Sequence, residues 1–189
     1  MSYVIPTNEL TLTDIKAFRG AAVEAGIARA LALGLARDRA ELVVREAFPL
    51  ADLGGAAAGW NTENYLSMVI PAVNAWCSAF STGALPGTQR QLSTTQVAIF
   101  YKFADVAANP VVNAVRYRVG AAGASTKTSF FLQLPTQAKL ESDVYFSEPV
   151  IYDPQSWLYI EIYPTGNLGG QEPIPMGCFI VEPLGGTIS

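Results

Sequence analysis

The most regular alternation along the chain lies in residues 147–164, SEPVIYDPQSWLYIEIYP. In an extended chain, successive side chains point to opposite faces of the sheet. One face of this segment is aliphatic and carries Leu158, Ile160 and Ile162, whereas the other carries Trp157, Tyr159, Glu161 and Tyr163. The pattern predicts a strand with its aliphatic face in a core. It also raises the question of what covers the aromatic face.

Further alternating segments surround this one and are separated by Gly, Pro, Asn and Ser residues that are typical of turns. The predicted strands lie within residues 41–49, 95–106, 111–120, 128–135, 138–147 and 175–183. Residues 60–92 read equally well as strands or as helical turns interrupted by Pro71. About eight short strands without long helices between them indicate an antiparallel sandwich, and eight favour a jelly roll over the immunoglobulin type. The expected fold is therefore mainly β, a jelly-roll-like β-sandwich.

The N-terminal 40 residues have a different pattern. Residues 1–12 show no periodicity, and we expect an extended arm that is ordered only against a partner. An amphipathic helix should follow, capped by Thr11 or Thr13, either continuous or broken near Gly20 or Gly26. Its apolar stripe comprises Ile15, Phe18, Ala22, Ile27, Leu31 and Leu35. This stripe fits the protein's own sheet or a neighbouring subunit equally well, and it suggests a division into an arm and helix (1–40) and a sandwich (41–189).

The composition favours an oligomer. Only 15% of the 189 residues are charged and 50% are hydrophobic, whereas ordinary soluble domains have about 25% charged residues. No uninterrupted apolar run reaches the roughly 18 residues of a membrane span. The excess of apolar side chains is then best placed at a subunit interface. With 16 acidic and 12 basic residues, the net charge of −4 argues against direct nucleic-acid binding.

Candidate chemistry is sparse. The chain has no histidine, which excludes Ser-His-Asp and Cys-His catalysis and HExxH zinc sites. Cys77 and Cys178 are expected to be free thiols, because the first ten residues do not resemble a secretory leader. The same start predicts a protein that stays in the cytoplasm where it is made. We expect no catalytic residue, no cofactor and no metal ligand, although a calcium site built from loop acids stays open (Asp105, Glu148 and Asp153).

Two other functional classes stay open at this point. A sugar-stacking platform could be built from the aromatic residues Trp60, Trp76, Trp157, Tyr159 and Tyr163. The same residue types also seal subunit contacts, where Tyr and Trp are enriched. A carboxylate-dependent hydrolase could use two acids from a cluster in the C-terminal half (Glu141, Asp143, Glu148, Asp153 and Glu161). Alternation of Glu141 and Asp143 with apolar residues instead places both on a solvated strand face.

A resemblance narrows the choice. The segments LVVREAFPLADLG, VAIFYKFADVAANPVVNAVRYRVG and FSEPVIYDPQSWLYIEIYP resemble small virion proteins of tailed phages, in particular capsid cement (decoration) proteins. The resemblance covers residues 40–164 and contains no diagnostic motif. It implies a protein without enzyme activity that clamps the major capsid protein of a phage shell, often as a homotrimer. The implied location is the capsid surface of a virion assembled in the host cytoplasm.

From this we predict which residues contact a neighbouring subunit. They are Ile15 and Phe18 on the N-terminal helix and Trp157, Tyr159 and Tyr163 on the strand near residue 160. The predicted partners are further copies of the chain and the capsid protein, without direct contact to nucleic acid or membrane.

Overall fold

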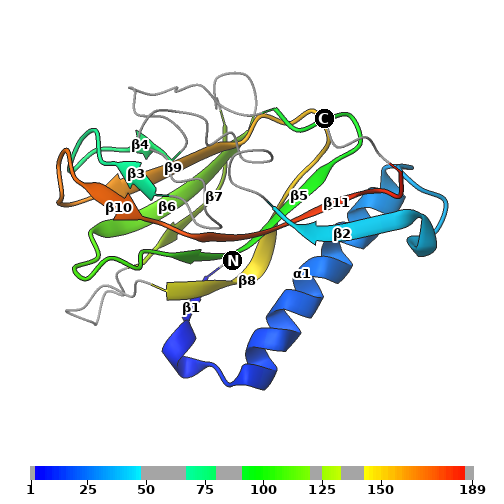
Figure 1. Ribbon diagram of the computed structural model, residues 1–189, viewed down its shortest axis with the longest axis horizontal. Coiled ribbons are helices and arrows are strands. Elements are labelled where there is room, and N and C mark those ends of the chain that lie inside the picture. Colours follow the sequence, from blue (N-terminus) through cyan, green and yellow to red (C-terminus); the bar gives the residue numbers. More distant parts are fainter. Residues whose placement is uncertain (1–2, 48–66, 80–90, 120–124, 133–142, 186–189) are drawn as a thin grey trace.

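The computed structural model describes residues 3–47, 67–79, 91–119, 125–132 and 143–185. The described residues form two packed antiparallel sheets, a small two-stranded ribbon and one long helix (Figure 1). The first sheet has the order β1 (Val4–Pro6), β8 (Asp143–Tyr152), β5 (Val97–Ala104), β11 (Met176–Pro183), β2 (Leu42–Glu46). The second has the order β4 (Cys77–Ser78), β9 (Tyr159–Pro164), β6 (Val112–Val119), β7 (Ser125–Phe131). The ribbon pairs β10 (Gln171–Pro173) with β3 (Ser67–Val69).

The order of the strands defines the fold as a jelly roll. Eight strands build the two sheets when β1 and the ribbon are set aside: β2, β4, β5, β6, β7, β8, β9 and β11. Numbered along the chain, the first, eighth, third and sixth of them make one sheet, and the second, seventh, fourth and fifth make the other. This arrangement of two interlocked Greek keys is that of the jelly roll. The predicted antiparallel jelly-roll-like sandwich is confirmed.

A single apolar core fills the space between the sheets. Tyr117 lies near its centre, with its ring centroid 5.3 Å from that of Phe100 and 5.7 Å from that of Phe146. The aliphatic face predicted for β9 and its lead-in belongs to this core, since Leu158, Ile160 and Ile162 are fully buried there. The prediction that the aliphatic face of this strand lies in a core is therefore confirmed.

The helix α1 (Leu12–Ala32) covers the outer face of the five-stranded sheet (Figure 1). It begins at Thr11, whose hydroxyl accepts the Asp14 N–H, while the Asp14 carboxylate accepts the Thr11 N–H. Such a capping box satisfies two N–H groups that would otherwise lack partners. The helix continues without a break through Gly20 and Gly26. At Gly26 an added Cβ would lie 2.5 Å from Ile99 Cδ1, so the missing side chain allows the helix to approach the sheet.

The N-terminal arm belongs to the sheet of its own chain. Residues Val4–Pro6 pair with Val144–Phe146 of β8 in antiparallel register, and the 3-10 turn Thr7–Glu9 leads from there into α1. The prediction that residues 1–12 are ordered only against a partner is therefore wrong for this part of the arm. A three-residue strand contains too few residues to show a period, and its hydrogen-bond partner lies about 140 residues further along the chain.

Two smaller predictions are also settled. The described part of the ambiguous region forms the short strands β3 and β4, not helical turns. Cys77 and Cys178 are both free and buried, as expected. Within the described residues, no helix has the length and apolar character that a membrane-spanning segment requires.

Candidate functional site

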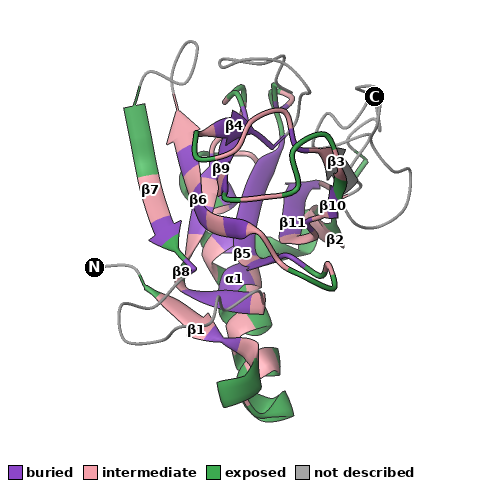
Figure 2. Ribbon diagram, turned by 90° about the vertical axis from the view of Figure 1, so that its left-hand side faces the viewer, coloured by how far each residue is buried: buried purple, intermediate pink, exposed green. Residues whose placement is uncertain are grey.

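The outer face of the four-stranded sheet carries most of the unusual side chains. Because Tyr117, Phe130 and Ile160 point into the core, the side chains that alternate with them point outward. Strand register then places Arg116 beside Glu161 and Ser129. We call this surface the arginine–aromatic face; its members are Trp76, Arg116, Arg118, Phe131, Tyr159, Glu161 and Tyr163. Figure 2 shows β7 at its rim, exposed along much of its length.

A buried carboxylate organises the centre of this face. Glu161 is only 2% exposed and receives hydrogen bonds from Arg116 Nε and from Arg118 Nη1, the latter at 3.1 Å. The Arg116 guanidinium also lies over the Trp76 ring, 4.2 Å from its centroid. The Trp76 ring in turn meets Tyr163 edge-on, with centroids 5.5 Å apart. Ion pairing and cation–π contact together hold these side chains in one arrangement.

The three aromatic residues predicted to share a face near residue 160 differ in how far they are exposed. Trp157 lies before β9 and is 40% exposed, whereas Tyr159 is only 8% exposed and Tyr163 is partly covered by Trp76. Tyr159 lies on the outward face of the sheet, as its period predicts, but neighbouring residues bury it; contact of these three residues with a second subunit stays a prediction. Phe131, by contrast, is 69% exposed at the end of β7 and was not singled out from the sequence. Its neighbours Phe130 and Leu132 share the inner face, so the alternation could have revealed it.

Ile15 and Phe18 lie on the side of α1 that faces the protein's own sheet. Both pack against the outer core cluster beneath the helix, and the Phe18 ring is 5.9 Å from that of Tyr145. The helix stripe thus contacts its own chain, one of the two alternatives left open by the sequence. A contact of either residue with a second subunit stays a prediction.

The proposed sugar platform is not assembled by the described aromatics. One face of Trp76 is covered by Arg116, and Tyr159 is buried. Trp157 stands apart as an exposed ring, and Trp60 lies outside the described residues. A stacking platform requires several exposed rings on one surface, and these residues do not provide it.

The acids considered for hydrolysis are held separately by cations. Asp143 is 3.0 Å from Lys102 Nζ, and Asp153 receives two hydrogen bonds from Arg29 at 2.6 and 2.7 Å. The Arg29 hydrogen bond lowers the pKa of Asp153, opposite to the change expected of a general acid. Glu161 is bound by two arginines, Glu148 is exposed, and Glu141 lies outside the described residues.

The loop acids do not form a cation site in the part of the chain that the structure describes. No group of three acidic or cysteine side chains lies close enough together there to hold a metal ion. Asp105 instead accepts hydrogen bonds from the backbone N–H groups of Ala107, Val111 and Val112. Asp105 therefore organises the turn that leads into β6.

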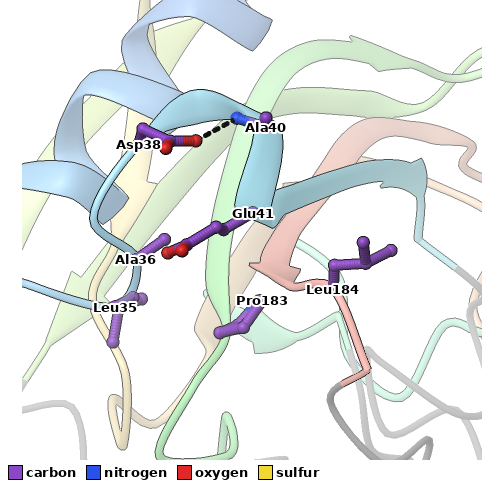
Figure 3. Close-up of a pocket in the computed structure, with 7 residues that line it drawn as sticks. All are labelled: Leu35, Ala36, Asp38, Ala40, Glu41, Pro183 and Leu184. Carbon is purple, nitrogen blue, oxygen red and sulfur yellow. Dashed lines mark hydrogen bonds between the residues drawn. The ribbon is translucent and has the colours of Figure 1, made fainter.

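A hollow lies near the C-terminal end of β11 (Figure 3). It is lined by Leu35, Ala36, Asp38, Ala40, Glu41, Pro183 and Leu184. Its two carboxylates accept backbone N–H groups, Asp38 from Ala40 and Glu41 from Arg37, both at 2.8 Å. Because these bonds hold the following 3-10 turn Arg39–Glu41, the two acids have a structural role.

The class defined by fold and surface is thus a jelly-roll protein with an arginine–aromatic outer face. No family model and no curated protein sequence matches the chain. Among solved structures, it is similar to the infectious bursal disease virus VP2 subviral particle, at 12% identity and a TM-score of 0.29. The match covers 76% of this chain and 32% of that chain, so this chain spans about a third of its length. At this TM-score the fold assignment rests on the strand order and not on the likeness.

Proposed function

We propose that the protein is a non-enzymatic structural component of a virion that binds a phage capsid shell as an oligomeric cement protein. In this proposal, the arginine–aromatic face contacts a sister subunit or the capsid protein. The observation that carries the proposal is the organised cluster of Trp76, Arg116, Glu161 and Tyr163 on an outer sheet face.

The residue types of this face support an interface. Trp, Tyr and Arg are the side chains that most often dominate binding energy between proteins. Arg116 and Arg118 are already held by Glu161, so little side-chain entropy would be lost when a partner covers them. Phe131, at the end of the edge strand β7, adds exposed apolar area at the rim of the same sheet, and Trp157, which precedes β9, is a partly exposed ring. A low content of charge in the whole chain fits the same reading.

The other support comes from the sequence resemblance to tailed-phage cement proteins, which implies a homotrimer and a non-catalytic role. A jelly roll alone does not select this function, because the same fold also serves lectins and enzymes. The surface residues therefore support a binding role, and the resemblance implies that the partner is a capsid protein. In a closed trimer, each subunit would present this face to its neighbour through the same rotation.

The experiment that tests the proposal locates the protein on particles. Antibodies against the purified chain should label the outside of intact virions in immunogold electron microscopy, and the protein should remain bound after the particles are purified by density. Its absence from purified particles would overturn the proposal. Glycan-array binding by the purified chain, with no particle labelling, would instead support the carbohydrate-binding class.

A further inference from the structure

Two acids, Asp105 and Glu172, lie together at one end of the sandwich and have no part in the proposed function. Asp105 follows β5 directly, and Glu172 is the central residue of β10. Both side chains are almost fully buried, at 1% exposure each. The Val106 N–H donates to the Pro173 carbonyl at 3.0 Å, which brings the two acids side by side, and contact with Asp105 is one cause of the raised pKa of Glu172. Two buried carboxylates that lie side by side cannot both hold a charge without a large energetic penalty.

The remaining contacts show which acid carries the proton. The oxygens of Asp105 accept three backbone N–H groups, including those of Val111 at 2.8 Å and Val112 at 3.0 Å. Glu172 Oε2 accepts a hydrogen bond from the Asn167 side-chain amide at 2.5 Å, but Glu172 Oε1 is buried and has no hydrogen-bond partner. A proton on that oxygen would be donated to Asp105 and would satisfy the one open position.

We propose that protonated Glu172 forms, with Asp105, a pH-sensitive lock between the β5–β6 turn and the β3–β10 ribbon. In the closed lock, protonated Glu172 donates a hydrogen bond to the Asp105 carboxylate. When the pH rises, this proton passes to solvent and leaves two adjacent buried charges. The side chain of Glu172 is then driven towards water, and β10 separates from the turn.

The surroundings of the pair favour this device. Asp105 faces Glu172 from the β5–β6 turn, the Val111 N–H lies beside both, and Asn167 faces Glu172 from the β9–β10 turn. Burial, followed by contact with Asp105, raises the pKa of Glu172 to about 7. At Gly170 an added Cβ would lie 1.9 Å from Asn167 Oδ1, so a larger residue there would displace the amide that contacts Glu172.

The sign of the effect follows from the direction of the shift. The pKa of Glu172 is raised by folding from 4.5 to about 7, so the stabilisation is complete below pH 4.5 and is lost as the pH rises through 7. Opening of the ribbon should therefore increase about tenfold per pH unit between these two values and level off above them.

The first measurement is direct titration of Glu172 in the intact protein by ¹³C NMR of glutamate side-chain carboxyls. A midpoint near pH 7 is expected, and a midpoint below pH 5 would overturn the proposal. Since it uses the unmodified chain, this result does not depend on whether any variant folds.

The second measurement is hydrogen exchange of the β3 and β10 amides from pH 5 to pH 8, corrected for the intrinsic rate. Protection should fall about a hundredfold between pH 5 and pH 7 in the unmodified protein. Glu172→Gln keeps a donor towards Asp105 and should abolish this dependence, whereas Glu9→Gln, an exposed acid in the turn Thr7–Glu9, should leave it unchanged. The same pH dependence in Glu172→Gln would overturn the proposal.

Discussion

The two outer sheet faces of the sandwich use the same chemistry but are covered differently. On the five-stranded sheet, Tyr101 and Phe179 stack with ring centroids 4.8 Å apart, and the Arg19 guanidinium lies 5.5 Å from the Phe179 centroid. On the four-stranded sheet, the Arg116 guanidinium lies over Trp76. The first face lies under α1, a segment of the same chain. Within the described part of the chain, no helix packs on the second.

The difference indicates how each face becomes stable. Arg19 on the helix side is held by Glu46, in an ion pair whose side chains are 45% and 68% exposed. The corresponding acid on the other face, Glu161, is buried between two arginines. On the face that the chain covers itself the ion pair is exposed to water, whereas the arginine–aromatic face is fixed by a buried carboxylate of the same sheet. We infer that preorganisation of this kind serves binding.

The largest effect is expected from removing Glu161, with the removal of Glu46 on the helix side as the matched comparison. Glu161→Ala would leave Arg116 and Arg118 without their shared partner and should lower the free energy of unfolding by about 3 kcal/mol. Glu46→Ala, the equivalent change on the helix side, should lower it by less than about 1 kcal/mol, because that pair is exposed. Urea denaturation of both variants measures the difference. Equal effects would show that the two faces are not organised differently.

The next effect separates association from folding. Trp157→Ala should weaken subunit association by about 2 kcal/mol or more, with little change in the urea midpoint of the isolated subunit. Phe18→Ala, which removes a ring packed beneath α1, should chiefly lower the urea midpoint. Sedimentation equilibrium and urea denaturation on each variant distinguish the two outcomes. Normal association of Trp157→Ala with a collapsed midpoint would assign the indole to the core.

Much of the fold could be predicted because apolar and polar residues alternate within individual strands. The alternation of Val115 and Tyr117 with Arg116 and Arg118 indicated a strand with one buried face, and β6 has this form. Strand β1 could not be found this way, since its evidence lies in a pairing with β8 and not in its own three residues. Strand order is likewise a property of distant pairings.

The candidate site was predicted less well for a related reason. Glu161 was read as one acid among several, and its partners are the two arginines of β6, about 45 residues away. Tyr159 was placed by period alone, which gives its direction but not whether neighbours bury it. The Asp105–Glu172 pair was missed because Glu172 stands between Gln171 and Pro173, in a sequence that reads as a loop. Contacts between strands cannot be obtained from a single alternating pattern.

A smaller effect concerns the covered face. An added methyl at Gly26 meets Ile99 and Val181, so Gly26→Ala should destabilise the protein by about 1 kcal/mol despite the better helix propensity of alanine. Gly20 has open space around it, and Gly20→Ala should stabilise the protein by about 0.5–1 kcal/mol. Thermal unfolding monitored by circular dichroism measures both. If Gly26→Ala is also stabilising, the helix does not pack closely on this sheet.

The central proposal is that the arginine–aromatic face joins subunits. The most direct test is the solution mass of the intact protein and of two variants, each replacing a strongly exposed apolar residue: Phe131→Glu on this face and Leu12→Glu on α1. Sedimentation equilibrium should give about three times the 20.2 kDa chain mass for the unmodified protein and for Leu12→Glu, and a folded monomer for Phe131→Glu. A monomeric unmodified protein, or a Phe131→Glu variant that keeps the oligomeric mass, would contradict the account.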